Sequence, residues 1–180
     1  MIYATIIKMP YLVGGKRKWF AMVWQSNNQL QVRDMSVSLY NQDFHAWTQK
    51  QAHLLKSGQL ADIDMENIIE EIEGMGASER SQLQSRLKIL IGHLLKWQYQ
   101  PAFRSRSWKL TIEEQRLSVV EMMEDSPSLK GVLAERLLKA YVHGVLLAAK
   151  ETYIDKKVFP ETCPYTIEQI LDATYYPDPA

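Results

Sequence analysis

The feature that most constrains this fold is a seam of large apolar residues whose spacing alternates between four and three. The seam consists of Leu83, Leu87, Leu90, Leu94 and Trp97. In an α-helix, residues with this spacing lie along one side, and burying them requires a second helix packed against that side. Pro101 ends the pattern, because a proline disfavours helical geometry in the residue before it. The spacing predicts a long helix over residues 78–99 and, with it, an all-α fold.

Helix start and stop signals recur through the rest of the chain. Asn41 and Asp64 can cap helices, Gly58 can end one, and Thr111–Glu114 and Thr166–Gln169 have the spacing of capping boxes. Helices two, three and five of the resulting bundle are expected to supply most of the core. We expect a single-domain bundle of five main helices plus a short C-terminal helix, at residues 41–56, 64–75, 78–99, 111–124, 127–150 and 166–173.

The second of these helices is expected to end at a pair of glycines, Gly74 and Gly76, because glycine weakens a helix. A short link around Gly76 would then let the second and third helices lie side by side. One side of the second helix carries the apolar residues that we expect to be buried, namely Ile68, Ile69, Ile72 and Met75.

The zero net charge of the chain hides an asymmetry. Residues 1–34 carry five cations and one anion, a net charge of +4, whereas the remaining 146 residues carry 16 cations and 20 anions, a net charge of −4. No helical period is sustained before Met35. We therefore expect two parts: an N-terminal arm over 1–34 that is poorly structured or a β-hairpin, and a helical domain over 35–180. We also expect the natural product to begin at Met35, with the arm outside it.

Composition and motifs exclude several classes of protein. The lone Cys163 rules out a disulfide framework and a zinc site built from several thiolates. No stretch reaches the ~18 apolar residues that span a bilayer, and the N-terminus lacks the order of a secretory signal, which predicts a cytoplasmic protein. The sequence contains no phosphate-binding loop, nucleophile elbow or zinc-protease motif. We therefore assign no catalytic residue, no metal ligand and no cofactor.

A first candidate binding site involves Glu71, Arg86 and His93. His93 stands beside the leucine seam, in line with Arg86 one heptad earlier, and Glu71 borders the apolar stripe of the second helix. If the two helices lie side by side, Glu71 and His93 face each other and could form a metal or small-molecule site or a proton relay. Such a pairing would raise the pKa of His93 unless desolvation outweighs it. The favoured interpretation is a hydrogen-bonded histidine at the core boundary.

A second candidate is the segment over residues 101–108. Arg104 and Arg106 could bind phosphates while Trp108 stacks on a base, which would indicate a nucleic-acid contact. Two cations in an acidic domain make a weak electrostatic footprint. We favour a structural role, in which the arginines pair with carboxylates of the second helix and Trp108 closes the end of the bundle.

The fifth predicted helix is apolar on nearly all sides. Beyond its core side, Leu138, Val142, Val145 and Leu146 make the opposite side apolar as well. Such a helix is either central in its bundle or forms an interface, and the central position is the favoured interpretation. The alternative predicts a self-association surface at Leu138, Val142 and Leu146.

Several unusual strings occur in a fixed order and carry a family resemblance. Over residues 38–176 the chain resembles the bacterial family called domain of unknown function 29, and the resemblance implies an all-helical fold. It implies no activity, substrate, cofactor or catalytic residue. The strings that carry it are LYNQDFHAWTQKQAHLLKSGQL, NIIEEIEGMGASER, HLLKWQYQP, RSRSWKLTIEEQR, DSPSLK and FPETCPYTIEQIL.

Three functions are consistent with these observations. The first is a non-catalytic cytoplasmic interaction or regulatory module, which binds a protein partner or a second copy of itself through the fifth helix. The second is a nucleic-acid-linked protein that uses Arg104, Arg106 and Trp108. The third is a metal or small-molecule site at Glu71 and His93. The absence of an assembled catalytic constellation favours the first function.

Overall fold

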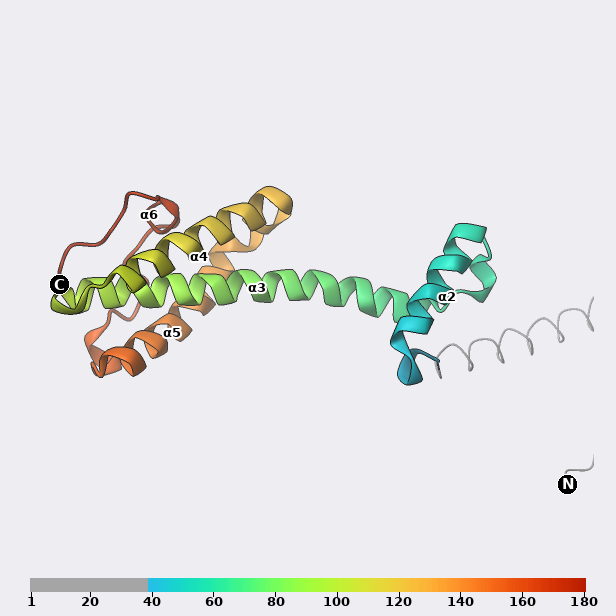
Figure 1. The fold of residues 1–180 in the computed structure, drawn as a ribbon, viewed down its shortest axis with the longest axis horizontal. Coiled ribbons are helices and arrows are strands. Elements are labelled where there is room, and N and C mark those ends of the chain that lie inside the picture. The colour runs from blue at the N-terminus through green and yellow to red at the C-terminus, as the bar shows by residue number, and fades with distance from the viewer. Residues whose placement is uncertain (1–38) are drawn as a thin grey trace, which may run out of the picture. The chain divides into compact units, whose positions relative to one another are not determined.

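The structure is a computed structural model that describes residues 39–180 (Figure 1). Within that range no strand occurs, which confirms the all-α fold. The expectations for residues 1–34, an arm without stable structure or with a β-hairpin and a natural start at Met35, lie outside the described residues. The α-helices are α2 (Phe44–Ser57), α3 (Met65–Tyr99), α4 (Arg106–Asp125), α5 (Leu133–Thr152) and α6 (Ile167–Leu171), and the 3₁₀ helices are η1 (Leu60–Asp62), η2 (Pro101–Phe103), η3 (Pro127–Val132) and η4 (Lys156–Val158).

The chain forms two compact units with a boundary between Ile72 and Glu73. The first unit contains α2 and the beginning of α3. Trp47 on α2 donates a hydrogen bond from Nε1 to Oδ2 of Asp64 at 3.1 Å, and Gln51 accepts one from the Asp64 backbone amide at 2.9 Å. All three residues are buried, so this polar network joins α2 to the start of α3.

The ends of α2 correct one expectation and confirm another. Asp43, and not Asn41, is the N-cap, because its carboxylate accepts the Ala46 amide at 2.9 Å. Residues 39–42 are themselves helical, so Asn41 lies before the start of α2. Gly58 ends the helix as predicted, with φ of 71°, a left-handed conformation that glycine adopts without strain.

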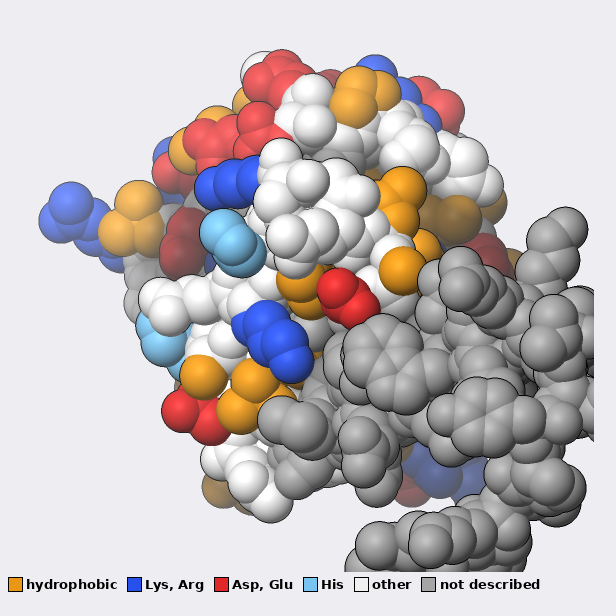
Figure 2. Space-filling model, turned by 90° about the vertical axis from the view of Figure 1, so that its right-hand side faces the viewer, with side chains coloured by type: hydrophobic (Ala, Val, Ile, Leu, Met, Phe, Trp, Pro, Cys, Tyr) orange, Lys and Arg blue, Asp and Glu red, His pale blue; other side chains and the backbone are white. Residues whose placement is uncertain are grey.

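The predicted break at Gly74 and Gly76 is wrong, because α3 continues through both glycines. A glycine costs a helix only about 1 kcal/mol relative to alanine and keeps its backbone amide, so two of them do not stop a long helix. The predicted burial of Ile69, Ile72 and Met75 is also wrong, since each is at least half exposed. Exposed apolar side chains stand beside acidic ones on the face drawn in Figure 2.

The second unit contains the core of the bundle. Leu83, Leu87, Leu90 and Leu94 are fully buried and Trp97 is partly buried, which confirms the seam. Figure 1 shows α4 and α5 lying along the part of α3 that carries the seam. These two helices supply the facing core residues, so α4 replaces the second predicted helix as a main contributor. The facing residues include Ile112, Val119, Leu137, Ala140 and Ala148.

The backbones of α3 and α5 approach closely at two glycines. A Cβ added to Gly92 would lie 2.7 Å from Leu147 Cδ2 and 3.3 Å from the Gly144 carbonyl oxygen. A Cβ on Gly144 would lie 3.1 Å from Ile91 Cγ2. All three distances are shorter than ordinary van der Waals contact, so this crossing requires the absence of side chains at both positions.

α4 begins earlier than the capping box at Thr111 predicts. Its N-cap is Ser105, whose hydroxyl accepts the Trp108 amide at 3.3 Å, and the helix starts at Arg106. The second capping box, Thr166–Gln169, is confirmed at the start of α6. Between α5 and α6, Phe159 and Tyr165 are buried in the core, and burial raises the pKa of the Cys163 thiol, which disfavours the thiolate.

Arg116 fastens the C-terminal segment to α4. This buried guanidinium donates to the carbonyl oxygens of Ile170 at 2.8 Å and of Tyr175, and it lies 5.2 Å from the Tyr176 ring. Burial lowers the pKa of Arg116. Carbonyl groups therefore satisfy a cation that the bundle has removed from water.

Candidate functional site

Glu71 lies in the first unit and has a partner there. It accepts a hydrogen bond from the Tyr40 hydroxyl, and that bond to a carboxylate raises the pKa of Tyr40 to about 12. The Tyr40 ring contacts the Trp47 ring edge-on, with centroids 4.9 Å apart. Glu71 therefore anchors an aromatic cluster at the start of α3.

The predicted pairing of Glu71 with His93 is wrong. It required a turn near Gly76, but α3 is continuous, and the two residues are separated by the length of helix between them. Nδ1 of His93 lies 2.9 Å from the Ile89 carbonyl oxygen, which can only accept, so Nδ1 carries the proton. Desolvation lowers the pKa of His93, the opposite of the shift that a facing carboxylate would cause.

His93 instead belongs to a cluster around Lys96. Lys96 is only 3% exposed, and its ammonium forms an ion pair with Glu151 of α5. Nζ lies 3.5 Å from His93 Nε2 and 4.3 Å from the centre of the Trp108 ring. The lysine cluster, defined as His93, Lys96, Trp108 and Glu151, thus joins α3, α4 and α5 through one buried cation.

Sequence reasoning identified His93 and Trp108 but missed Lys96 and Glu151. One signal was present for Lys96, which follows the buried Gly92 by one helical turn and stands between Leu95 and Trp97. No spacing rule connects it to Glu151, which is 55 residues away. The described residues contain no group of three or more His, Cys, Asp or Glu side chains placed to hold a metal ion.

The predicted pairing of Arg104 and Arg106 with carboxylates of the second predicted helix is wrong, because neither arginine forms an ion pair within residues 39–180. Arg104 donates from Nε to the Trp97 carbonyl oxygen at 2.9 Å and lies over the Trp97 ring. Arg86 donates to the Gln115 side chain at 3.4 Å. Arg106, the first residue of α4, is exposed. Of the two arginines predicted to bind phosphate, Arg104 is thus occupied by the protein's own backbone.

The side of α5 that faces away from the core is exposed and apolar. Leu138, Val142 and Leu146 are 66%, 60% and 50% exposed, and Val145 beside them is partly buried. We call these four residues the outer face of α5. The favoured central position for this helix is therefore wrong, because a central helix would have both sides covered.

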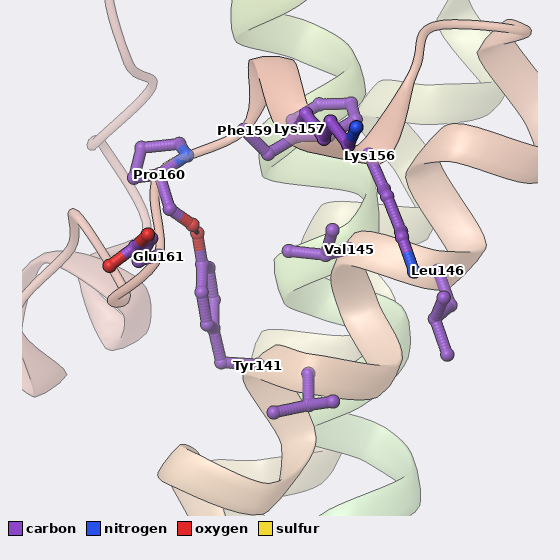
Figure 3. A pocket seen from close by; sticks show the side chains of 9 residues that line it. Tyr141, Val145, Leu146, Lys156, Lys157, Phe159, Pro160 and Glu161 are labelled. Carbon is purple, nitrogen blue, oxygen red and sulfur yellow. Dashed lines mark hydrogen bonds between the residues drawn. The ribbon is translucent and has the colours of Figure 1, made fainter.

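A groove of about 500 Å³ runs beside this outer face. Val145 and Leu146 stand on one side, Phe159 and Pro160 stand on the other (Figure 3), and Val142 also lines the groove. The Tyr141 hydroxyl donates to the Pro160 carbonyl oxygen and so holds the far wall in place. Figure 3 shows the Lys156 side chain extending along the groove toward Leu146; the remaining lining residues are Lys157 and Glu161.

Comparisons with known proteins identify a family and no individual relative. Among the described residues, no helix is both long and apolar enough to cross a membrane. A search of curated proteins and a search of solved structures each find no match. The family model described as Domain of unknown function DUF29 matches residues 39–176, well over half of the chain, and so covers part of the first unit and nearly all of the second. The chain therefore belongs to the Domain of unknown function DUF29 family.

Proposed function

We propose that this chain is a non-catalytic interaction or regulatory module of the bacterial cytoplasm that binds a protein partner through the outer face of α5. One observation carries the proposal: Leu138, Val142 and Leu146 form a continuous apolar stripe on a helix whose other side is buried. Successive residues of the stripe are four apart, so each lies one turn above the last.

The stripe has the energetic character of a binding surface. Burying one Val or Leu side chain contributes about 1.5 to 3 kcal/mol, so covering three of them offers a partner a substantial gain. The adjoining groove provides a concave apolar wall into which a side chain of the partner can fit. A surface helix that served only the fold would carry polar residues at these positions.

The two alternative functions have less support. Binding of nucleic acid through Arg104, Arg106 and Trp108 would require Arg104 to leave the Trp97 carbonyl and Trp108 to leave Lys96. A metal or small-molecule site at Glu71 and His93 would require the two residues to meet, and each has other partners.

Site-specific photo-crosslinking in the native host tests the proposal. A photoreactive amino acid at Val142 is expected to yield a discrete crosslinked protein, which the additional change Leu146→Lys should abolish. The matched control places the same amino acid at Leu117, an equally exposed apolar position on α4, and should yield none. Equal crosslinking at both positions, or none at Val142, would refute the proposal. Fractionation of the same cells tests the cytoplasmic location.

A further inference from the structure

A second apolar stripe that no other part of residues 39–180 covers lies on the first turns of α3. Met65, Ile69 and Ile72 are 51%, 50% and 64% exposed and share one side of the helix. We call them the α3 stripe. Glu66 and Glu70 lie about 60° and 100° round the helix from Ile69, the nearest residue of the stripe, so both carboxylates stand on the polar side next to one edge of the stripe. The beginning of α3 is thus an acidic amphipathic helix whose apolar side is left exposed by the rest of the described chain.

The groove beside α5 has the opposite charge. Lys156 and Lys157 line it together with one carboxylate, Glu161, and Lys150 follows Leu146 by one turn at the end of α5, so the cations are in excess. No ion pair joins these three lysines, or Glu66 and Glu70, to another charged side chain of residues 39–180. The lysines thus form a basic border on an apolar surface, in a domain whose net charge is −4.

We propose that the α3 stripe of one copy docks against the outer face and groove of α5 in a second copy. This inference rests on the proposed function, since it uses the same α5 surface and names the partner as a second copy of the chain. Apolar residues would cover apolar residues, while Glu66 and Glu70 would meet the lysines at the border. One contact would therefore cover both exposed stripes and pair charges that have no ionic partner within the described residues.

Charge favours this contact over a parallel pairing of two α5 helices. The three lysines lie at the C-terminal end of α5 and just after it, so a parallel pairing would bring the lysine border of one copy near that of the other, and like charges in an interface oppose binding. The proposed contact joins two different surfaces, so it is heterologous. It either closes into a ring, with a reciprocal dimer as the smallest case, or continues into longer assemblies.

A charge exchange between two variants tests the proposal by sedimentation velocity. One variant carries Glu66→Lys and Glu70→Lys beside the α3 stripe. The other carries Lys156→Glu and Lys157→Glu in the groove. Wild type is expected to self-associate, more weakly at high salt. Each double variant alone should bind itself at least about tenfold more weakly, because like charges then meet. An equimolar mixture of the two double variants should associate again. Each contact between unlike variants then joins an α3 stripe and an α5 groove that carry opposite charges.

The control variant reverses the charge at two exposed positions outside the proposed contact. It carries Glu121→Lys and Glu124→Lys on α4 and should leave self-association unchanged. Circular dichroism on every variant checks that the helices remain folded. Wild type that stays monomeric at the highest attainable concentration overturns the inference, as does a mixture that stays monomeric. Persistent self-association of the Glu66→Lys, Glu70→Lys variant would assign the contact to α5 alone. If wild type is monomeric yet Val142 still crosslinks to another protein, the proposed function survives and only the identity of the partner is wrong.

Discussion

The two halves of α3 have similar apolar patterns and opposite surroundings. In the first half, Met65, Ile69 and Ile72 share one side of the helix and are exposed, whereas in the second half Leu83, Leu90 and Leu94 share one side and are completely buried. Both patterns satisfy the spacing of an amphipathic helix. The difference shows that spacing predicts which side of a helix is apolar but does not determine whether another element of the same chain covers it.

The strongest test of this comparison is a pair of truncations to alanine. Leu90→Ala should lower the free energy of unfolding by about 3 kcal/mol, because it leaves a cavity in a fully buried position. Ile72→Ala, on the exposed half, should change it by less than about 0.5 kcal/mol. Urea denaturation monitored by circular dichroism measures both. Similar losses for the two variants would mean that the first half is covered in solution.

Glycine substitutions sharpen the same contrast. Gly92→Ala should destabilise the protein by about 1 to 3 kcal/mol, because its new Cβ would overlap Leu147 and press on the backbone of α5. Gly74→Ala should stabilise it by about 0.5 to 1 kcal/mol, since nothing lies within 4 Å of its Cβ and alanine favours a helix. Thermal unfolding of the two variants provides the measurement. A stabilising Gly92→Ala would contradict the close crossing of α3 and α5.

Substitutions in the ion pair between Lys96 of α3 and Glu151 of α5 should change the free energy of unfolding by a smaller amount. Glu151→Gln should cost about 1 to 2 kcal/mol, less than the loss expected for a fully buried pair, because Glu151 is 39% exposed and water partly replaces it. Lys96→Met removes the cation itself and should cost less than about 1 kcal/mol, because methionine fills similar space without a charge. A loss for Lys96→Met as large as that for Glu151→Gln, measured by chemical denaturation, would show that the ion pair itself stabilises the fold.

The pH dependence of stability reports on His93 and is the smallest of the expected effects. Its pKa in the folded protein is below the ordinary value of 6.5, so the unfolded chain binds a proton first as the pH falls. Stability is therefore lost as the pH falls from about 6.5 through the folded-state pKa, and is fully present above that window. His93→Gln should flatten the profile there, whereas His143→Gln, at an exposed position on α5, should not. An unchanged profile in His93→Gln would show that other groups cause the loss.

Local signals predicted a large part of the fold. The leucine seam predicted the buried side of α3, Gly58 predicted the end of α2, and Thr166–Gln169 predicted the start of α6. These features depend on side chains and backbone groups within a few residues of one another, which the order of residues specifies directly. The helix end predicted at Gly74 and Gly76 was wrong, because the cost of two glycines to helix formation is small compared with the stability of a long helix.

The candidate sites were harder to predict. His93, Arg104 and Trp108 were recognised as unusual, but their partners, which include Lys96, the Trp97 carbonyl group and the backbone of Pro177, are set by the packing of α4, α5 and the C-terminal segment on α3. The outer face of α5 was recognised as apolar, although its exposure could not be decided from periodicity. A partner that is distant in sequence leaves no local spacing to detect.

The sequence by itself determined the helical class, the membership of the family, the seam of α3 and the apolar character of both sides of α5. Only the tertiary structure decided that Lys96 is buried beside Glu151, that α3 and α5 meet at Gly92 and Gly144, and that the outer face of α5 and the α3 stripe are exposed. Helix formation depends on hydrogen bonds and side chains within about one turn, so the residue order determines it. Burial depends on which distant surfaces meet, and one amphipathic pattern serves equally well for a core contact and for a binding surface.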